Sequence, residues 1–267
     1  MKKRLLCPQL PTPGNSITLS SQEAHHAIGV YRLRDGDIVE AIDGQGNRAY
    51  VLLRTHHGSP KIESIKPDSH RIIQPFAAEK PCPVVLEIAI LKGEAMEWVV
   101  EKSVELGIDK LVPVITDHTV VQIKTKGPDY FQNRWQKIAD QALKQCGRAH
   151  QMGISSPTPL NTLLATPLPN HVPVRLWCDE KQEDPSSNLL HWIDLHSSAL
   201  LSEMTILIGP EGGWSSQERA LLLETSKYRP IHRIQLGPYI LRSETAALFC
   251  ISILTAQARS KHFSKTL

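Results

Sequence analysis

The chain has 267 residues, of which 41% are hydrophobic and 21% are charged, a composition that excludes a disordered or fibrous protein. No run of about 18 apolar residues is present to cross a membrane. The formal net charge of +3 lies entirely in residues 1–72, which hold 10 Lys and Arg against 7 Asp and Glu. That bias is compatible with a polyanionic partner, and random variation of the surface explains it equally well.

The first quarter of the chain is predicted to be rich in β-strands. Residues 37–42 and 49–53 are short aliphatic and β-branched runs on either side of Asp43-Gly44, which is the pattern of a β-hairpin. Short strands with little helix predict a small β-barrel over residues 1–72. Four prolines between Pro67 and Pro83 indicate an extended linker, so we place a domain boundary near residue 73.

The remainder, residues 73–267, alternates apolar runs with segments of helical periodicity. Such alternation predicts a parallel α/β domain with helices on both faces of the sheet. The expected strands are 84–91, 111–114, 174–178, 205–208 and 231–236, and the expected helices are 96–107, 135–146, 189–201, one from 216 and one from about 244.

The five cysteines are scattered, and no Cys-x-x-Cys pair occurs. Their odd number and spacing predict neither a disulfide framework nor a zinc site, and they favour a reducing cytoplasm. Because no His-Glu-x-x-His motif occurs either, we expect no metal site.

A glycine-rich segment follows the expected strand 205–208. Gly209-Pro210-Glu211-Gly212-Gly213 places three glycines in five residues, which lets a ligand approach bare backbone. Ser215 and Glu218 have capping-box spacing, so a helix should begin there with amides free to hold polar ligand atoms. A plain strand-to-helix turn is the alternative, although it needs fewer glycines. The segment matches neither the G-x-G-x-x-G dinucleotide motif nor a phosphate loop.

A second Gly-Pro pair, Gly237-Pro238, follows the expected strand 231–236. Ile240 and Leu241 come next, and apolar side chains beside free backbone groups suit a flat heteroaromatic ring such as adenine. Arg242 stands at an expected helix start, where the dipole disfavours a cation, and this favours a functional role over an ordinary surface charge. Since ligands of open α/β sheets bind at the carboxyl ends of strands, we expect both segments to form one site.

These two motifs together resemble a known family of enzymes. Gly-Pro-Glu-Gly-Gly with Leu-Gly-Pro-x-Ile-Leu-Arg-x-Glu-Thr-Ala is similar to the SPOUT methyltransferases, specifically the bacterial 16S rRNA (uracil-1498-N3)-methyltransferase family. Residues 101–108, 134–148 and short motifs between residues 25 and 44 also match, so the resemblance spans nearly the whole chain. Tyr239 and Ser243 depart from the family pattern, in which many members carry Arg and Thr.

The resemblance implies a fold and a reaction that periodicity alone does not show. It implies a trefoil-knotted α/β domain over residues 73–267, preceded by a PUA-like barrel over residues 1–72. It also implies S-adenosylmethionine as methyl donor, a homodimer with the site at its interface, and N3 of a uridine in 16S rRNA of the small ribosomal subunit as target. The cofactor-binding residues that it implies are Ile208, Gly209, Glu211, Gly212, Gly213, Leu236, Gly237, Ile240, Leu241, Arg242 and Ala246.

Three residues are candidates for the chemistry. Uracil N3 becomes nucleophilic as its proton leaves, so the site needs a base or an anion stabiliser. Arg242 can stabilise a developing uracilate oxygen or bind a neighbouring phosphate. Glu211 or Glu244 can act as base if burial raises its pKa, and capping of backbone amides is the alternative that we favour for both carboxylates.

The expected RNA contacts are Lys3, Arg4, Arg32 and Arg34, basic residues of the predicted barrel that would bind phosphates. Two other functions stay open at this point. One is a member of the same superfamily that methylates another RNA, and the other is a non-catalytic RNA-binding protein of ribosome assembly. Intact Glu211, Arg242 and Glu244 disfavour the second.

Overall fold

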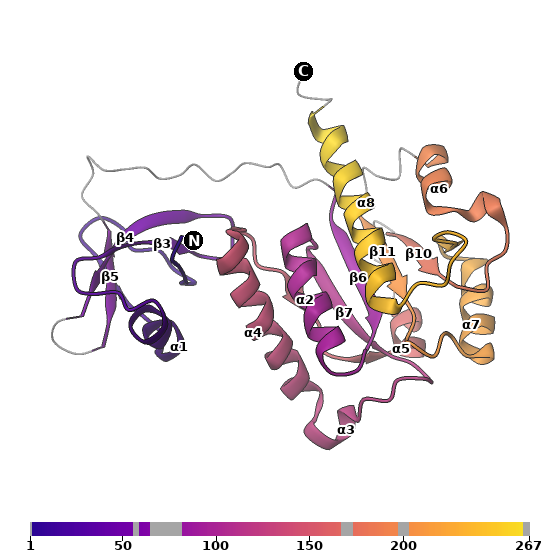
Figure 1. Cartoon of the computed structure of the whole chain (residues 1–267), viewed down its shortest axis with the longest axis horizontal. Coiled ribbons are helices and arrows are strands. Elements are labelled where there is room, and N and C mark those ends of the chain that lie inside the picture. The colour runs from indigo at the N-terminus through magenta and orange to yellow at the C-terminus, as the bar shows by residue number, and fades with distance from the viewer. Residues whose placement is uncertain (1, 56–58, 65–81, 167–172, 197–202, 264–267) are drawn as a thin grey trace. The chain divides into compact units, whose positions relative to one another are not determined.

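The computed structural model describes residues 2–55, 59–64, 82–166, 173–196 and 203–263 (Figure 1). The chain divides into two compact units. The first is Met1–Ala78 with Asp140–Gln151, and the second is Glu79–Ala139 with Met152–Leu267. The boundary predicted near residue 73 and most of the predicted linker lie outside the described residues. The segment that returns to the first unit was not expected from the sequence.

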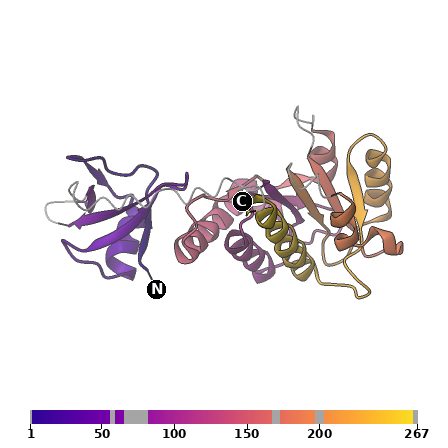
Figure 2. The same cartoon turned by 90° about the horizontal axis from the view of Figure 1, so that it is seen from above.

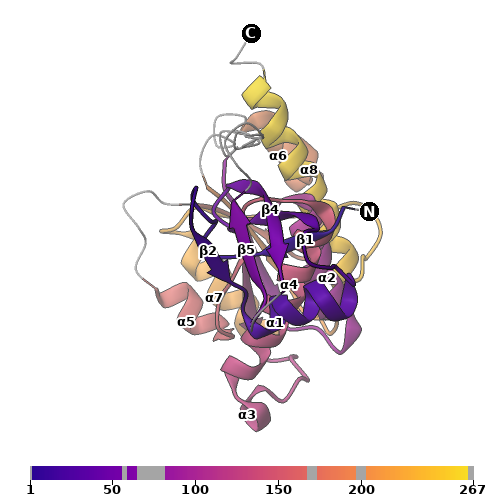
Figure 3. The ribbon, with the colours of Figure 1, turned by 90° about the vertical axis from the view of Figure 1, so that its left-hand side faces the viewer.

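The first unit contains a curled, mixed five-stranded sheet (Figure 3). The strand order is β1-β3-β4-β5-β2, and only the β1–β3 pair is parallel. The predicted hairpin around Asp43 is confirmed, because β3 and β4 pair antiparallel and the Asp43 carboxylate accepts amide hydrogens from Gln45 and Asn47. The strands are β1 (Arg4–Leu6), β2 (Ser16–Thr18), β3 (Ile38–Ile42), β4 (Arg48–Arg54) and β5 (Lys61–Ser64).

A short helix, α1 (Ser21–His25), continues into a π-helical turn at His26–Val30. At five residues, α1 is too short to produce a periodic apolar pattern, and the sequence did not predict it. Its Glu23 is buried and accepts a hydrogen bond of 2.6 Å from Lys144 Nζ, which is also buried. Burial and the nearby Glu23 carboxylate raise the pKa of the Cys7 thiol to about 12.

Arg4, one of the basic residues expected to contact RNA, makes several contacts inside the first unit. Its Nε lies 2.6 Å from a carboxylate oxygen of Glu40, and its Nη1 donates to the carbonyls of Lys144 and Gln145. Those carbonyls end helix α4 (Pro128–Cys146), where a cation is favoured by the helix dipole. Gly147, with φ +79°, makes room, since a Cβ there would lie 2.7 Å from Arg4 Cζ. The Arg4 guanidinium therefore has its partners, Glu40 and the end of α4, inside the first unit.

The second unit confirms the predicted parallel α/β architecture (Figure 1). Its sheet has the order β12-β10-β11-β6-β7-β8, with β9 also paired to β7, and every pair is parallel. The strands are β6 (Val84–Ala89), β7 (Lys110–Ile115), β8 (Gly153–Ile154), β9 (Thr158–Pro159), β10 (Val174–Cys178), β11 (Met204–Ile208) and β12 (Ile231–Ile234). The helices are α2 (Glu94–Leu106), α3 (Ile123–Lys126), α5 (Leu160–Ala165), α6 (Leu189–Leu195), α7 (Ser216–Ser226) and α8 (Ser243–Phe263), besides the start of α4.

Helices cover both faces of this sheet, so β6 and β11 are buried along their whole length. Figure 2 shows α2 and α8 packed together on one side and α7 on the other. The core on the α5 and α7 side includes Leu160, Trp177, Leu207 and Leu222. Glu87, which interrupts the apolar sequence of β6, is buried in an ion pair with Arg175 of β10 at 2.7 Å.

The register of the central strands determines where a ligand can bind. Trp177 of β10 pairs with Leu207 of β11, and Cys178 pairs with Ile234 of β12. The three strands therefore end at the same edge of the sheet, and the loops that follow them meet there. Helix α6 ends at Leu195, before the predicted residue 201, and residues 197–202 lie outside the described part of the chain. Among the described residues, none of the helices combines the length and apolarity needed to cross a membrane.

Candidate active site

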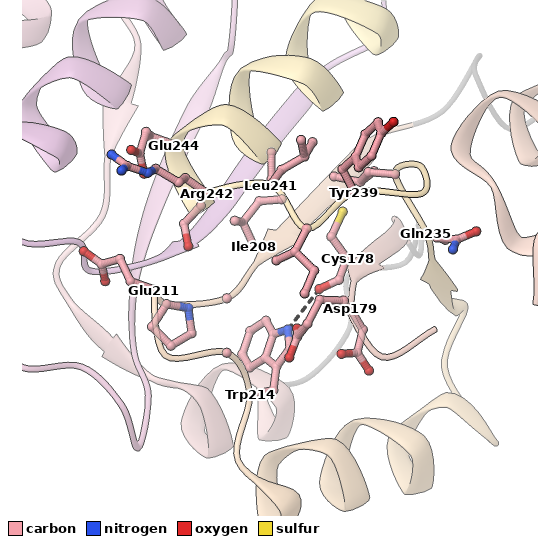
Figure 4. A pocket seen from close by; sticks show the side chains of 18 of the residues that line it. Cys178, Asp179, Ile208, Glu211, Trp214, Gln235, Tyr239, Leu241, Arg242 and Glu244 are labelled. Carbon is pink, nitrogen blue, oxygen red and sulfur yellow. Dashed lines mark hydrogen bonds between the residues drawn. The ribbon is translucent and has the colours of Figure 1, made fainter. Parts of the chain in front are cut away.

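A cavity of about 750 Å³ lies at this edge, where β10, β11 and β12 end. Both Gly-Pro segments line it, and Figure 4 shows Glu211, Arg242 and Glu244 on one side and Gln235 on the opposite side. The structure brings together every residue that the sequence predicted for cofactor binding. The lining includes Ile208, Gly209, Glu211, Gly212, Gly213, Leu236, Gly237, Ile240, Leu241, Arg242 and Ala246, as well as Glu244.

The glycine-rich loop, defined here as residues 209–214, is anchored from beneath by Trp214. This side chain is 2% exposed, and its Nε1 donates a hydrogen bond of 2.9 Å to the carbonyl of Cys178 (Figure 4). A Cβ at Gly209 would lie 2.9 Å from Cε2 of the Trp214 ring, so a glycine is needed for the ring to pack there. The loop after β11 is thereby fixed to the end of β10.

Neighbouring loops fix the outer part of the glycine-rich loop. The Glu211 carboxylate accepts the amide hydrogen of Lys92 at 3.1 Å, and His118 Nδ1 lies 2.8 Å from the carbonyl of Gly213. This geometry agrees with the amide-capping role favoured for Glu211, because one carboxylate oxygen already has a donor. Gly213 has φ +70°, a backbone conformation that other residues adopt at a cost.

The predicted capping box is confirmed at the start of α7. Ser215 Oγ accepts from the Glu218 amide, and the Glu218 carboxylate accepts from the Ser215 amide. The other carboxylate oxygen of Glu218 accepts the amide hydrogen of Asp117, and Ser215 Oγ lies 2.5 Å from the Asp117 carboxylate. The cap therefore also holds the loop that follows β7.

The sequence analysis missed the acidic residues after β10. Asp179, whose side chain is fully buried, pairs with Arg233 at 2.6 Å and with Arg219 at 3.2 Å. Arg219 also binds Glu180 and the carbonyl of Trp214. Asp179 and Glu180 line the cavity, as do Trp214, Gln235 and Tyr239. Their position in the sequence was the available signal, because Asp179 and Glu180 directly follow β10, which ends at the same edge as β11 and β12.

The second segment, residues 236–241, differs in its exposure. Tyr239 is 82% exposed and Ile240 is 80% exposed, and Gly237 has φ +146°. Arg242 is exposed where α8 begins, and Glu244 is half-buried one residue into that helix. The candidate catalytic side chains therefore line a cavity between two loops. The glycine-rich loop is hydrogen-bonded to neighbouring segments, and segment 236–241 is largely exposed.

The comparisons with known proteins agree with this geometry. The sequence profile of the RNA methyltransferase domain family matches residues 78–255. The chain belongs to this RNA methyltransferase family. Two curated relatives, from Bacillus subtilis and from Synechocystis, are each 26% identical and named ribosomal RNA small subunit methyltransferase E. The matches cover 91% of this chain and 90% of the Bacillus protein, and 92% of this chain and 74% of the Synechocystis protein.

Solved structures extend the likeness to the fold. A methyltransferase from Legionella pneumophila, solved in complex with the bound cofactor SAM, is 26% identical with a TM-score of 0.77, and the match covers 96% of this chain and 98% of that one. A Porphyromonas gingivalis protein, described as a probable rRNA-methyltransferase, is 25% identical with a TM-score of 0.68, and the match covers 97% of this chain and 99% of that one. Both of these solved structures thus match this chain over its two units.

In this member of the RNA methyltransferase family, the remaining basic candidates lie in the first unit. Arg32 and Arg34 are exposed, and Arg32 has the left-handed backbone conformation, with φ +52°. Lys3 is exposed, and its Nζ donates to the carbonyl of Tyr31 at 2.8 Å. Among the described residues, no group of three or more His, Cys, Asp or Glu is placed to hold a metal ion.

A thiol pair lies beneath the methyltransferase cavity. Cys178 at the end of β10 lines the cavity, and its Sγ is 3.7 Å from Sγ of Cys250 on α8. The hydrogen bond shared with Cys178 and complete burial both raise the pKa of the Cys250 thiol well above its ordinary value. Cys250 is therefore held in the neutral form, which is a poor nucleophile.

Proposed function

We propose that this chain transfers a methyl group from S-adenosylmethionine to N3 of a uridine in 16S rRNA of the small ribosomal subunit, at the position numbered 1498 in that RNA. The observation that carries the proposal is the convergence of two Gly-Pro loops on one cavity of about 750 Å³. Membership of the RNA methyltransferase family, the curated names of the relatives and the SAM complex of the Legionella protein all support it.

The residues present fit the cofactor. A volume of about 300–1,000 Å³ is usual for small-molecule sites, and the cavity lies in that range. Ile208, Leu236 and Leu241 supply apolar surface for the adenine ring, and the backbone of the glycine-rich loop offers polar groups to the rest of the molecule. When bound, S-adenosylmethionine supplies an electrophilic methyl group on a sulfonium sulfur.

The side chains of this site then orient the base and balance its charge. Removal of the N3 proton leaves negative charge on the uracil oxygens, and we assign its stabilisation to the Arg242 guanidinium, which lines the cavity. Glu211 positions the Lys92 backbone through its hydrogen bond of 3.1 Å. Glu244, one residue into α8, lines the same cavity as Arg242. Holding the two reactants in line can supply about 7–11 kcal/mol of the barrier reduction.

The first unit is proposed to bind RNA. We assign it the role of a PUA-like barrel in which Lys3, Arg32 and Arg34 contact phosphates, because all three are exposed and basic. We also propose that the α/β domain is knotted, that two copies form a dimer around the active sites, and that the enzyme works in the cytoplasm. The five free cysteines fit a reducing compartment.

The decisive experiment combines cofactor binding with mapping of the product. Calorimetry should show that the wild type binds S-adenosylmethionine, and the same measurement on Arg242→Ala separates a loss of cofactor affinity from a loss in the chemical step. Mass mapping of 16S rRNA from a strain that lacks the enzyme should show one methyl group on a uridine N3 after treatment with the wild type. Loss of one preorganised charge stabiliser typically costs about 10²–10³-fold in kcat, which is the loss expected for Arg242→Ala.

Lys227→Ala is the matched control, since this exposed lysine caps the far end of α7. It should retain full activity. Methylation of a different RNA or base would replace the proposed substrate, and failure to bind S-adenosylmethionine would favour a non-catalytic assembly protein. Full methylation by Arg242→Ala would remove Arg242 from the chemistry.

A further inference from the structure

A second groove of about 440 Å³ lies beside the cofactor cavity, within the same unit. Lys92, the segment 117–120 and the pair Glu211–Gly212 line it, and that pair also lines the larger cavity. The two spaces therefore share one wall. A molecule in the groove would therefore lie beside Glu211 and Gly212, the residues that also border the cavity.

The hydrogen bond that His118 makes determines its tautomer. Its Nδ1 lies 2.8 Å from the carbonyl oxygen of Gly213, and a carbonyl can only accept. Nδ1 must therefore carry the hydrogen. In the neutral ring, this leaves the lone pair on Nε2, and within the described residues that nitrogen has no hydrogen-bond partner. The side chain is exposed and lines the groove, so Nε2 is accessible to a ligand there.

The charged groups around His118 favour a neutral polar ligand over a phosphate. Lys92 faces the groove from the β6–α2 loop, Glu211 from the glycine-rich loop, and Asp117 precedes the histidine in the β7–α3 loop. One ammonium and two carboxylates give no net positive charge. They offer hydrogen-bond donors and acceptors side by side, which complements the imide edge of uracil with its two carbonyl oxygens and one N–H.

We propose that this groove holds the target uracil and that His118 Nε2 accepts its N3 proton. The inference rests on the proposed function and deepens it. The N3–H bond breaks, the proton goes to Nε2, and the electron pair stays on N3, with charge spread to carbonyl oxygens near Lys92. That pair forms the bond to the methyl carbon as the carbon–sulfur bond breaks, and the bonding electrons leave with sulfur as a neutral thioether. The exposed imidazolium then returns its proton to water.

The test compares the wild type with His118→Ala and His118→Gln, using small ribosomal subunits from a strain that lacks the enzyme. General base catalysis contributes about 10²–10⁴-fold, so kcat should fall by about 100-fold or more in both variants. The pH profile of kcat should differ between the wild type and both variants. Added imidazole should restore part of the rate of His118→Ala.

His118→Gln separates proton transfer from bracing of the loop, because its amide N–H can still donate to Gly213 while the side chain cannot accept a proton. His191→Ala, an exposed histidine on α6, is the matched control and should behave as wild type. Full activity of His118→Gln would overturn the proposal. So would a rise in KM and a changed salt dependence with the pH profile of kcat intact, which would indicate a phosphate contact.

The failure of this inference is distinguishable from failure of the proposed function. If wild-type protein binds S-adenosylmethionine and methylates uridine N3, the function stands whatever the His118 variants do. Unchanged S-adenosylmethionine affinity in the variants shows that the cavity is intact. An unchanged kcat and pH profile in those variants would then overturn the assignment of His118 alone.

Discussion

The two loops that enclose the cavity are built differently. The glycine-rich loop is held by Trp214 bonded to the end of β10, by His118 on the Gly213 carbonyl and by Glu211 on the Lys92 amide. In segment 236–241, the Tyr239 and Ile240 side chains are largely exposed, and a Cβ at Gly237 would meet no atom within 4 Å. Within the described residues, no hydrogen bond fixes the side chains of that segment to the rest of the chain.

This difference indicates a division of labour between the loops. A braced loop keeps its binding geometry without a ligand, so little conformational entropy is lost when the cofactor binds. An open loop can adjust around the ligand and admit or release it, as mobile loops do in many enzymes. Substitutions that disturb the braced loop should therefore destabilise the fold, whereas substitutions in the open loop should act mainly on binding.

Gly209→Ala should have the largest effect, because its methyl group would lie 2.9 Å from the Trp214 ring and no flexible side-chain end can move aside. Overpacking of this kind costs about 1–3 kcal/mol. For a protein of this size, a loss of about 2 kcal/mol lowers Tm by about 4–8 °C. Affinity for S-adenosylmethionine should fall by about tenfold or more, which calorimetry would measure beside a thermal melt.

Gly153→Ala is the control for this substitution, since a Cβ there meets nothing within 4 Å and its φ is not positive. It should leave both Tm and cofactor affinity near those of the wild type. If Gly209→Ala melts at the wild-type temperature, Trp214 does not hold the loop as the structure indicates.

Much of this site was predictable from the sequence because its parts are local. The capping box at Ser215 and the two Gly-Pro pairs are short patterns whose geometry depends on adjacent residues. The rule that ligands bind at the carboxyl ends of parallel strands then placed both loops at one edge. The β3–β4 hairpin was predictable for the same reason, since its turn residues stand beside the strands.

What the sequence did not reveal depends on contacts between distant residues. Arg4 looked like a surface cation, but it caps the end of α4 about 140 residues away, and no local pattern announces that partner. The tautomer of His118 depends on Gly213, and the burial of Asp179 depends on Arg219 and Arg233. The return of residues 140–151 to the first unit is likewise a tertiary property of a helix whose own sequence is continuous.

Gly237→Ala tests the open loop with the opposite expectation. Its φ of +146° is one that other residues rarely adopt, so alanine introduces strain of about 1–3 kcal/mol unless the loop relaxes. Because the surrounding space is empty, we expect relaxation, a change in Tm of less than about 2 °C and a loss of cofactor affinity of about fivefold. A fall in Tm as large as that of Gly209→Ala would show that both loops are equally braced.

Tyr239→Ala should have the smallest effect on the isolated chain. The side chain is 82% exposed, and surface substitutions away from special features change the free energy of unfolding by about 0.5 kcal/mol or less. Tyr228→Ala, at 67% exposure beyond the end of α7, is the matched control.

A thermal melt of both variants and of the wild type at two protein concentrations tests whether Tyr239 is exposed in solution or packs against a second copy of the chain. If Tm falls for Tyr239→Ala alone, and if the wild-type Tm rises with protein concentration, then Tyr239 packs against a second copy of the chain, since only association makes Tm depend on concentration. The open loop would in that case be braced by a partner, and the contrast between the two loops would hold only for the single chain.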